Sequence, residues 1–138
     1  MFATAANVSK AYSRLAVESA ALGADSHQLV GMLFTGTLTA IGQARAALAR
    51  GDIGAKAMAS SRAIRLVDEG LKVAVDRSVG ALGEQLFQLY DYCARRLLHA
   101  HVKHDDQAYA EVASLLSELE AAWSSISPNG GATLRRAS

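Results

Sequence analysis

Apolar side chains recur at three- and four-residue spacing along most of this chain, which is the period of an α-helix and not of a strand. The clearest stripe lies near the carboxy terminus and consists of Ala108, Val112, Leu115, Leu119, Ala122 and Ile126. The same spacing links Leu82, Leu86, Leu89, Cys93, Leu97 and Ala100. Alanine, the strongest helix former, supplies 28 residues. Because an apolar helix face must be covered by another element, the sequence predicts an all-α fold.

Short connections divide this pattern into four helices, expected at about 26–50, 53–76, 81–103 and 106–126. Asp25, Asp52 and Asp105 stand where helix caps are expected, and Gly51 follows the first helix. Helices of about 22–25 residues joined by short loops lie antiparallel, which predicts an up-down four-helix bundle. We expect a single domain over 1–138, with an amino-terminal cap segment (1–24), the bundle (25–126) and a flexible tail (127–138).

The charge balance and the residue types argue against several classes of protein. Lysine and arginine number 14, and aspartate and glutamate 13, whereas nucleic-acid-binding domains usually carry a basic excess. No apolar run is long enough to span a membrane, and the start lacks the features of a secretory signal. The single cysteine, Cys93, cannot form an intrachain disulfide, which fits a reducing compartment. We therefore expect a cytoplasmic protein that neither binds nucleic acid nor inserts into a membrane.

Motifs for catalysis or cofactor binding are missing from the sequence. There is no phosphate-binding glycine loop, no His-Glu-x-x-His and no Gly-x-Ser-x-Gly. The Glu-x-x-His pairs that hold di-iron centres in helical bundles are also absent. His101 and His104 fall on one face near a helix end, but no carboxylate or cysteine on the same turn completes a tetrahedral metal site. We expect no enzyme activity, no cofactor and no metal.

The predicted helices carry more apolar surface than a four-helix core needs. Five of the six positions from 29 to 34 are apolar, and at about 100° per residue they surround the helix, so one side cannot face the core. Leu66 and Val73 lie off the main stripe of the second helix. A second heptad line in the fourth helix runs through Tyr109, Leu116 and Trp123. Scattered exposed side chains explain any one of these positions, but the whole set favours a groove for another polypeptide.

Tyrosines and arginines cluster in the third helix. With the apolar stripe toward the core, Tyr90 is expected at a helix–helix boundary and Tyr92 on the opposite flank. Asp91 then points toward water, within reach of Arg95 four residues later. Because Arg95 and Arg96 diverge by about 100°, at most one of them faces a groove. Tyrosine and arginine are enriched at protein interfaces, so the cluster indicates a surface for a partner.

Two segments resemble motifs of the FliS family, the bacterial flagellin export chaperones. Residues 26–36, SHQLVGMLFTG, resemble the first-helix motif of that family, and residues 90–97, YDYCARRL, resemble its third-helix motif. Further similarities in the same order extend the resemblance over most of the chain; they include Ala11-Tyr12, Gly51-Asp52-Ile53 and Ala121-Ala122-Trp123. Ser26 and Thr35 depart from the pattern, which usually has proline and an acid at these positions.

The resemblance implies a chaperone that binds the disordered carboxy-terminal segment of flagellin, prevents premature polymerisation and delivers it to the flagellar type III export gate. It also implies an amino-terminal segment, here 10–24, that folds over the groove and moves when cargo binds; an ordinary fifth packing element is the alternative. The residues expected to bind the partner or cover the groove are Tyr12, Val17, Leu29, Val30, Leu33, Phe34, Leu66, Val73, Tyr90, Tyr92 and Arg96.

Two other functions stay open at this stage. A general helical adaptor would bind a regulator or another export component instead of flagellin. The other is a small helical bundle that holds a metal or a cofactor, which an absorption spectrum or a metal analysis of the purified protein would reveal. Weak self-association of the free protein is also open, because an uncovered apolar groove favours it.

Overall fold

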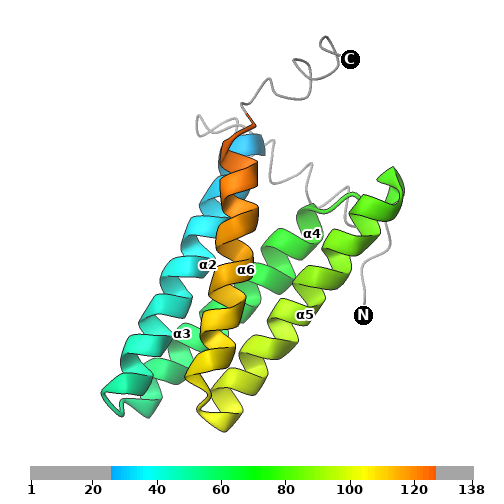
Figure 1. Cartoon of the computed structure of the whole chain (residues 1–138). Coiled ribbons are helices and arrows are strands. Elements are labelled where there is room, and N and C mark those ends of the chain that lie inside the picture. The colour runs from blue at the N-terminus through cyan, green and yellow to red at the C-terminus, as the bar shows by residue number, and fades with distance from the viewer. Residues whose placement is uncertain (1–25, 127–138) are drawn as a thin grey trace.

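The computed structural model describes residues 26–126, and all regular structure in this range is helical (Figure 1). The three uninterrupted long helices are α2 (Ser26–Ala49), α5 (Ala81–Lys103) and α6 (Asp106–Ser124). The fourth helical segment is composite: α3 (Ile53–Leu66) continues through a π-helical turn (Val67–Leu71) into α4 (Lys72–Ala74). A 3₁₀ turn (Arg77–Val79) then leads to α5. The predicted cap segment and tail lie outside the described residues.

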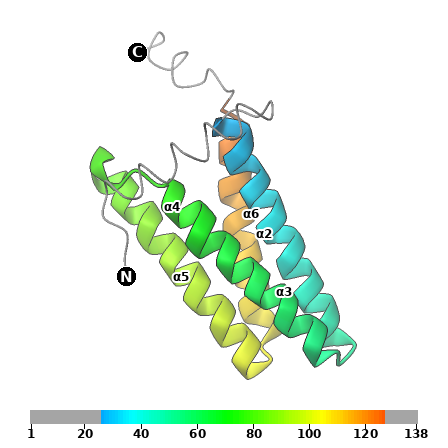
Figure 2. The same cartoon turned by 180° about the vertical axis from the view of Figure 1, so that it is seen from behind.

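The four helical segments form the predicted up-down bundle. Each of α2 and α5 packs against both α3 and α6. Around the bundle the order of the helices is therefore α2, α3, α5 and α6, with α6 next to α2 again. The α2–α3 and α5–α6 turns lie at one end of the bundle (Figures 1 and 2). Toward the other end, the α2–α6 pair separates from the α4–α5 pair. The bundle is therefore closed at its turn end and open where α2 begins and α6 ends.

The first turn follows from its sequence. Gly51 adopts a φ of 73°, which a glycine reaches without steric cost, and it ends α2. The Asp52 N–H donates to the Ala47 carbonyl at 2.9 Å, a bond typical of this kind of helix ending. The Asp52 carboxylate accepts from the Ala55 N–H at 3.1 Å, which caps α3. The predicted roles of Gly51 and Asp52 are confirmed.

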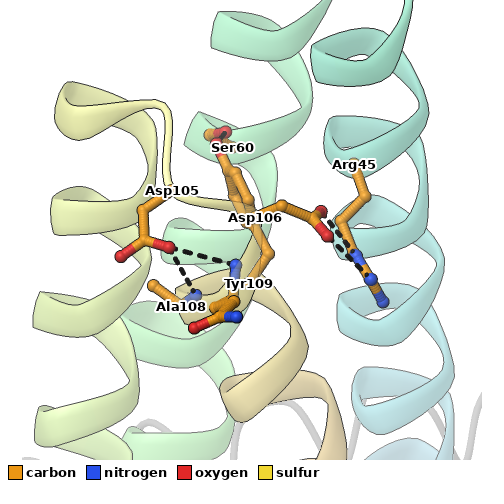
Figure 3. A network of polar contacts seen from close by, with 7 residues as sticks. Arg45, Ser60, Asp105, Asp106, Ala108 and Tyr109 are labelled. Carbon is orange, nitrogen blue, oxygen red and sulfur yellow. Dashed lines mark hydrogen bonds and ion pairs between the residues drawn. The ribbon is translucent and has the colours of Figure 1, made fainter.

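The second turn makes the same backbone bond without a glycine. His104 has a φ of 52°, in the left-handed region that few residues other than glycine adopt. The Asp105 N–H donates to the Ala100 carbonyl at 2.9 Å. The Asp105 carboxylate accepts from the N–H groups of Gln107 (3.0 Å) and Ala108 (3.3 Å), which confirms it as the cap of α6 (Figure 3).

A buried lysine of α3 holds this turn. Lys56 is 0% exposed, and its ammonium donates to the His101 carbonyl at 2.7 Å and to His104 Nδ1 at 2.8 Å. The positive charge thus meets the carbonyl end of α5, where the helix dipole favours a cation. Burial lowers the pKa of Lys56. The hydrogen bond from Lys56 to His104 helps to stabilise the left-handed backbone conformation of His104.

Two more contacts join α6 to its neighbours at the turn end (Figure 3). The hydroxyls of Ser60 and Tyr109 lie 2.6 Å apart in the core. On the surface, the Arg45 guanidinium donates twice to the Asp106 carboxylate, at 2.8 and 3.0 Å. Because Ser60 belongs to α3 and Arg45 to α2, these bonds tie α6 to both.

The predicted stripes of α5 and α6 face the core for most of their length, but single members were misplaced. Tyr109 and Leu116 are fully buried, although the sequence placed them on a line beside the core, whereas Ala122 of the predicted stripe is exposed. Leu82, predicted to be a core residue, is 65% exposed. Tyr109 and Leu116 are buried because α6 packs against both α2 and α5, so its buried face is wider than one stripe. Leu82 and Ala122 are exposed because they lie at the open end, where they line a cavity.

The contacts among Lys56, His101 and His104 predict that the protein loses stability in mild acid. Burial, Lys56 and His104 lower the pKa of His101 below its ordinary value of 6.5. The unfolded chain then binds the proton more readily, so stability is complete above pH 6.5 and falls as the pH drops below it. Urea unfolding at about pH 7 and about pH 5 measures the loss. The variant His101→Gln should lose less stability over this interval, and an equal loss in the variant contradicts the assignment to His101.

Candidate functional site

An apolar cavity of about 450 Å³ lies at the open end of the bundle. All four helical segments contribute to it, because the helices separate here before their apolar faces end. Its only lining carboxylate among the described residues is Asp76. The apolar and aromatic side chains around it include Val30, Phe34, Leu71, Val75, Leu82, Leu86, Tyr90, Leu119, Trp123 and Ile126.

The rim of this cavity is held by a reciprocal contact between His27 and Trp123. Their rings stack with centroids 4.9 Å apart and planes 12° from parallel. The Trp123 indole N–H donates to the His27 carbonyl at 2.9 Å, and His27 Nε2 lies 2.9 Å from the Trp123 carbonyl. A carbonyl only accepts, so Nε2 carries the proton in this bond. The contact fixes the start of α2 against the end of α6.

Tyr90 closes the inner wall of the cavity. It is 5% exposed, and its ring lies 6.5 Å from that of Phe34 at an angle of 55°. Burial, with a smaller contribution from Cys93, raises the pKa of the Tyr90 hydroxyl to about 12. Its hydroxyl makes no hydrogen bond within residues 26–126. Tyr90 therefore acts here as a large apolar surface.

A second depression, of about 780 Å³, lies over α3 and the adjoining part of α2. Leu33 packs tightly at its edge, since a Cβ added to Gly70 would lie 2.8 Å from a Leu33 methyl carbon. Gly70 belongs to the π-helical turn, a departure from α-helix that the sequence did not predict. The lining residues are Leu29, Leu33, Ala57, Met58, Ser61, Arg62, Arg65, Leu66, Glu69 and Gly70.

Tyr92 and Arg96 lie on a third surface, where α5 meets α6. The Tyr92 hydroxyl donates to Glu111 Oε2 at 2.5 Å, and Arg96 Nε donates to Glu111 Oε1 at 2.7 Å. Both bonds lower the pKa of the Glu111 carboxyl, the one from Tyr92 most. One carboxylate thus holds both predicted binding residues, and neither lines the two hollows above.

Asp91 does pair with Arg95, at 3.0 Å and at the predicted four-residue spacing. It points less toward water than expected, because it also bonds Lys72 of α4 at 3.0 Å and its side chain is only 28% exposed. Lys72 lowers the pKa of the Asp91 carboxyl most, and Arg95 adds to this. The sequence could not place Lys72, which lies 19 residues away in the chain.

The structure divides the predicted binding residues among separate surfaces. Val30, Phe34 and Tyr90 line the end cavity, and Leu29, Leu33 and Leu66 line the depression over α3. Val73 is half-buried and lines neither hollow. Tyr12 and Val17 lie outside the described residues. The roles of all eleven in binding a partner stay predictions.

Sequence reasoning missed several residues that line these hollows. Trp123 was noted for its heptad spacing and as part of a family motif but not as a binding residue, and Leu82 was assigned to the core. Met58, Arg62 and Arg65 lie on the outer face of α3, where a helical pattern predicts only solvent contact.

No set of three histidine, cysteine, aspartate or glutamate side chains between residues 26 and 126 is arranged to hold a metal ion. Burial raises the pKa of the Cys93 thiol to about 12, which disfavours the reactive thiolate. None of the helices in the described range is long and apolar enough to cross a bilayer.

A helical bundle with apolar hollows at its surface is typical of small helical proteins that bind other polypeptides. The chain itself belongs to the FliS family: the family model "Flagellar protein FliS" matches residues 8–130. The flagellar secretion chaperone FliS of Salmonella typhimurium is 47% identical over 86% of this chain and 89% of that protein. Its Escherichia coli counterpart is 38% identical over 86% and 88%.

A third relative, the flagellar secretion chaperone FliSB of Pseudomonas aeruginosa, is 34% identical over 86% of this chain and 94% of that protein. The family resemblance read from the two helix motifs is therefore confirmed. All three relatives are named as chaperones rather than enzymes, which agrees with the expectation that this chain is not an enzyme.

The two tyrosines should differ in their effect on stability. Tyr90→Ala removes a buried ring and should lower the free energy of unfolding by about 3 kcal/mol. Tyr92→Ala removes a ring that is 36% exposed and should cost about 1 kcal/mol or less. Tyr90→Phe is the control, because it removes only the hydroxyl. Denaturant unfolding measures all three, and similar losses for Tyr90→Ala and Tyr92→Ala would contradict this placement.

Proposed function

We propose that this protein is a cytoplasmic export chaperone that binds the disordered carboxy-terminal segment of flagellin. Binding prevents premature polymerisation, and the complex delivers flagellin to the flagellar type III export gate. Membership of the FliS family supports this function, as do the names of the relatives. The structural observation that carries it is the apolar cavity at the open end of the bundle.

The cavity suits an amphipathic segment that orders when it binds. A helix can lay apolar side chains, spaced three or four residues apart, between the separated helices of the bundle. Val30, Phe34 and Tyr90 would form the floor, since each is buried yet lines the cavity. Ordering the client costs free energy, which moderates the affinity and favours release at the export gate.

The client must be flagellin for this proposal to hold. A pull-down with full-length flagellin from the same bacterium should recover it, and flagellin that lacks its carboxy-terminal segment should not be recovered. Capture of another export component in place of flagellin would point to the adaptor function instead. The proposal is contradicted if this protein recovers neither full-length flagellin nor the shortened form.

Two leucines of α5 provide a matched test of the cavity. Leu82 and Leu98 are 65% and 54% exposed, but only Leu82 lines the cavity. Leu82→Gln should weaken binding of a flagellin carboxy-terminal fragment by about tenfold, because an apolar contact is lost. Leu98→Gln should leave the affinity unchanged. Calorimetry measures both, and equal affinities would exclude this cavity as the binding site.

A further inference from the structure

A π-helical turn interrupts the third helical segment where it reaches the end cavity. At the end of α3 the Val67 N–H bonds to the Ala63 carbonyl, four residues back, whereas the Lys72 N–H bonds to the Val67 carbonyl, five residues back. The turn at Val67–Leu71 therefore holds one residue more than a regular α-turn. Only Lys72–Ala74 continue as α-helix beyond it, in the direction of the open end of the bundle (Figure 2).

The extra residue decides which side chains face inward after the turn. Val67 is fully buried, and the buried stripe that leads to it is regular, with Lys56, Ser60 and Ala63 four and three residues apart. In a regular α-helix Val75 would lie about 80° around the axis from Val67, because eight residues make about 2.2 turns. With one residue taken up by the π turn, Val75 has the place of the seventh residue, about 20° from Val67. Val75 is accordingly only 8% exposed.

An ion pair with α5 depends on the same register. The Lys72 ammonium lies 3.0 Å from a carboxylate oxygen of Asp91, and only 12% of the Lys72 side chain is exposed. Without the extra residue, Leu71 would take the place of Lys72 and bring an apolar side chain beside Asp91. Asp91 would then lose its bond to Lys72. The ion pair and the inward position of Val75 therefore require the same register.

The π turn also lies at the boundary between the two hollows. Its consecutive residues Gly70 and Leu71 line different ones: Gly70 the depression over α3, and Leu71 the end cavity. Gly70 is buried, and a Cβ added to it would lie 2.8 Å from a Leu33 methyl carbon, so α2 packs against bare backbone here. Contacts with α2 on one side and, through Lys72, with α5 on the other therefore hold the turn in place.

We propose that the π turn positions one wall of the end cavity for the client: its extra residue turns Leu71 and Val75 toward the cavity, where the client contacts them. In a regular α-helix the places of Leu71 and Val75 would be taken by Gly70 and Ala74, which offer less apolar surface. The register of this turn thus sets the shape of the cavity and the affinity for the client. This inference rests on the proposed function and adds the local element on which its binding site depends.

Deletion and insertion of one residue test the register. Glu69 is an exposed residue of the turn that does not line the cavity. Deleting Glu69 should leave a regular α-turn with both flanks facing as before, so the variant should unfold at no lower urea concentration than the parent and bind a flagellin carboxy-terminal fragment within about twofold of it. Inserting an alanine after Glu69 should weaken binding by about tenfold or more, because it turns the wall residues by about 100°. Glu69→Ala controls for loss of the side chain.

A deletion in the regular part of α3 is the matched control for stability. Ser61 is exposed like Glu69, but its removal should turn Ala63 and Val67 out of the core by about 100° and lower the urea midpoint clearly. This comparison needs no client. If deletion of Glu69 costs as much stability as deletion of Ser61, the register assignment is wrong and the chaperone function stands.

Protection of introduced thiols reads the register in the full-length chain. Val73 and Ala74 are adjacent and both half-buried, but only Ala74 lines the cavity, and the native Cys93 is buried. With the flagellin fragment at about ten times its Kd, labelling of Ala74→Cys by a thiol reagent should slow about tenfold, and that of Val73→Cys should change less than about twofold.

The outcomes separate this inference from the proposed function. Equal protection of the two thiols, or protection of Val73→Cys alone, would show that the client does not contact the wall in this register and would overturn the inference. Unchanged binding after the alanine insertion would overturn it as well. If the parent binds no flagellin fragment, the proposed function fails too, whereas the stability comparison of the two deletions still tests the register.

Discussion

The hydrogen bonds of one buried ammonium organise the closed end of this bundle. Lys56 reaches from the first turn of α3 to the end of α5, where it bonds the His101 carbonyl and His104 Nδ1. A cation near the start of its own helix is disfavoured by the dipole, but at the end of a neighbouring antiparallel helix it is favoured. The interaction therefore requires that α3 and α5 be antiparallel and in register. It also supports the left-handed His104, from which the capped start of α6 follows.

The two ends of the bundle differ in how tightly their helices pack. The turn end holds Lys56, the Ser60–Tyr109 pair and the Arg45–Asp106 ion pair, whereas the open end holds the cavity. There the reciprocal contact of His27 and Trp123 joins α2 to α6 without closing them onto α5. A bundle with equal packing at both ends would bury its apolar residues internally. The asymmetry leaves apolar surface accessible at one end of the bundle while the other end is held by buried polar contacts, as the proposed function requires.

Short-range features were predictable, and long-range ones were not. The positions of Gly51, Asp52 and Asp105 depend on local backbone chemistry, so the two tight turns followed from the sequence. The π-helical turn at Val67–Leu71 and the end of that helix at Ala74 did not. The buried face of α6 depends on two neighbouring helices: the predicted stripe holds the buried Ala108 and Val112, but it left out Tyr109 and Leu116, which are also fully buried. Lys56 was missed because a lysine is expected in water, and only the carbonyl end of a distant helix makes its burial favourable. The surplus of apolar residues at 29–34 was a correct signal of accessible apolar surface, but it could not show that these residues divide between two separate hollows.

The sequence by itself determined that this protein is an all-α bundle of the FliS family. Helical periodicity, capping residues and the order of motifs are local features, so they can be recognised without the tertiary structure. Tertiary structure decided which apolar residues stay accessible, since accessibility depends on where helices separate and not on residue type. It decided that Glu111 holds both Tyr92 and Arg96, because the pairing joins residues 15 to 19 positions apart on two helices. It also decided that Arg62 and Arg65 have no partner within residues 26–126, while the other arginines of that range have one. Such pairing requires the relative positions of side chains from different helices, and these exist only once the bundle has packed.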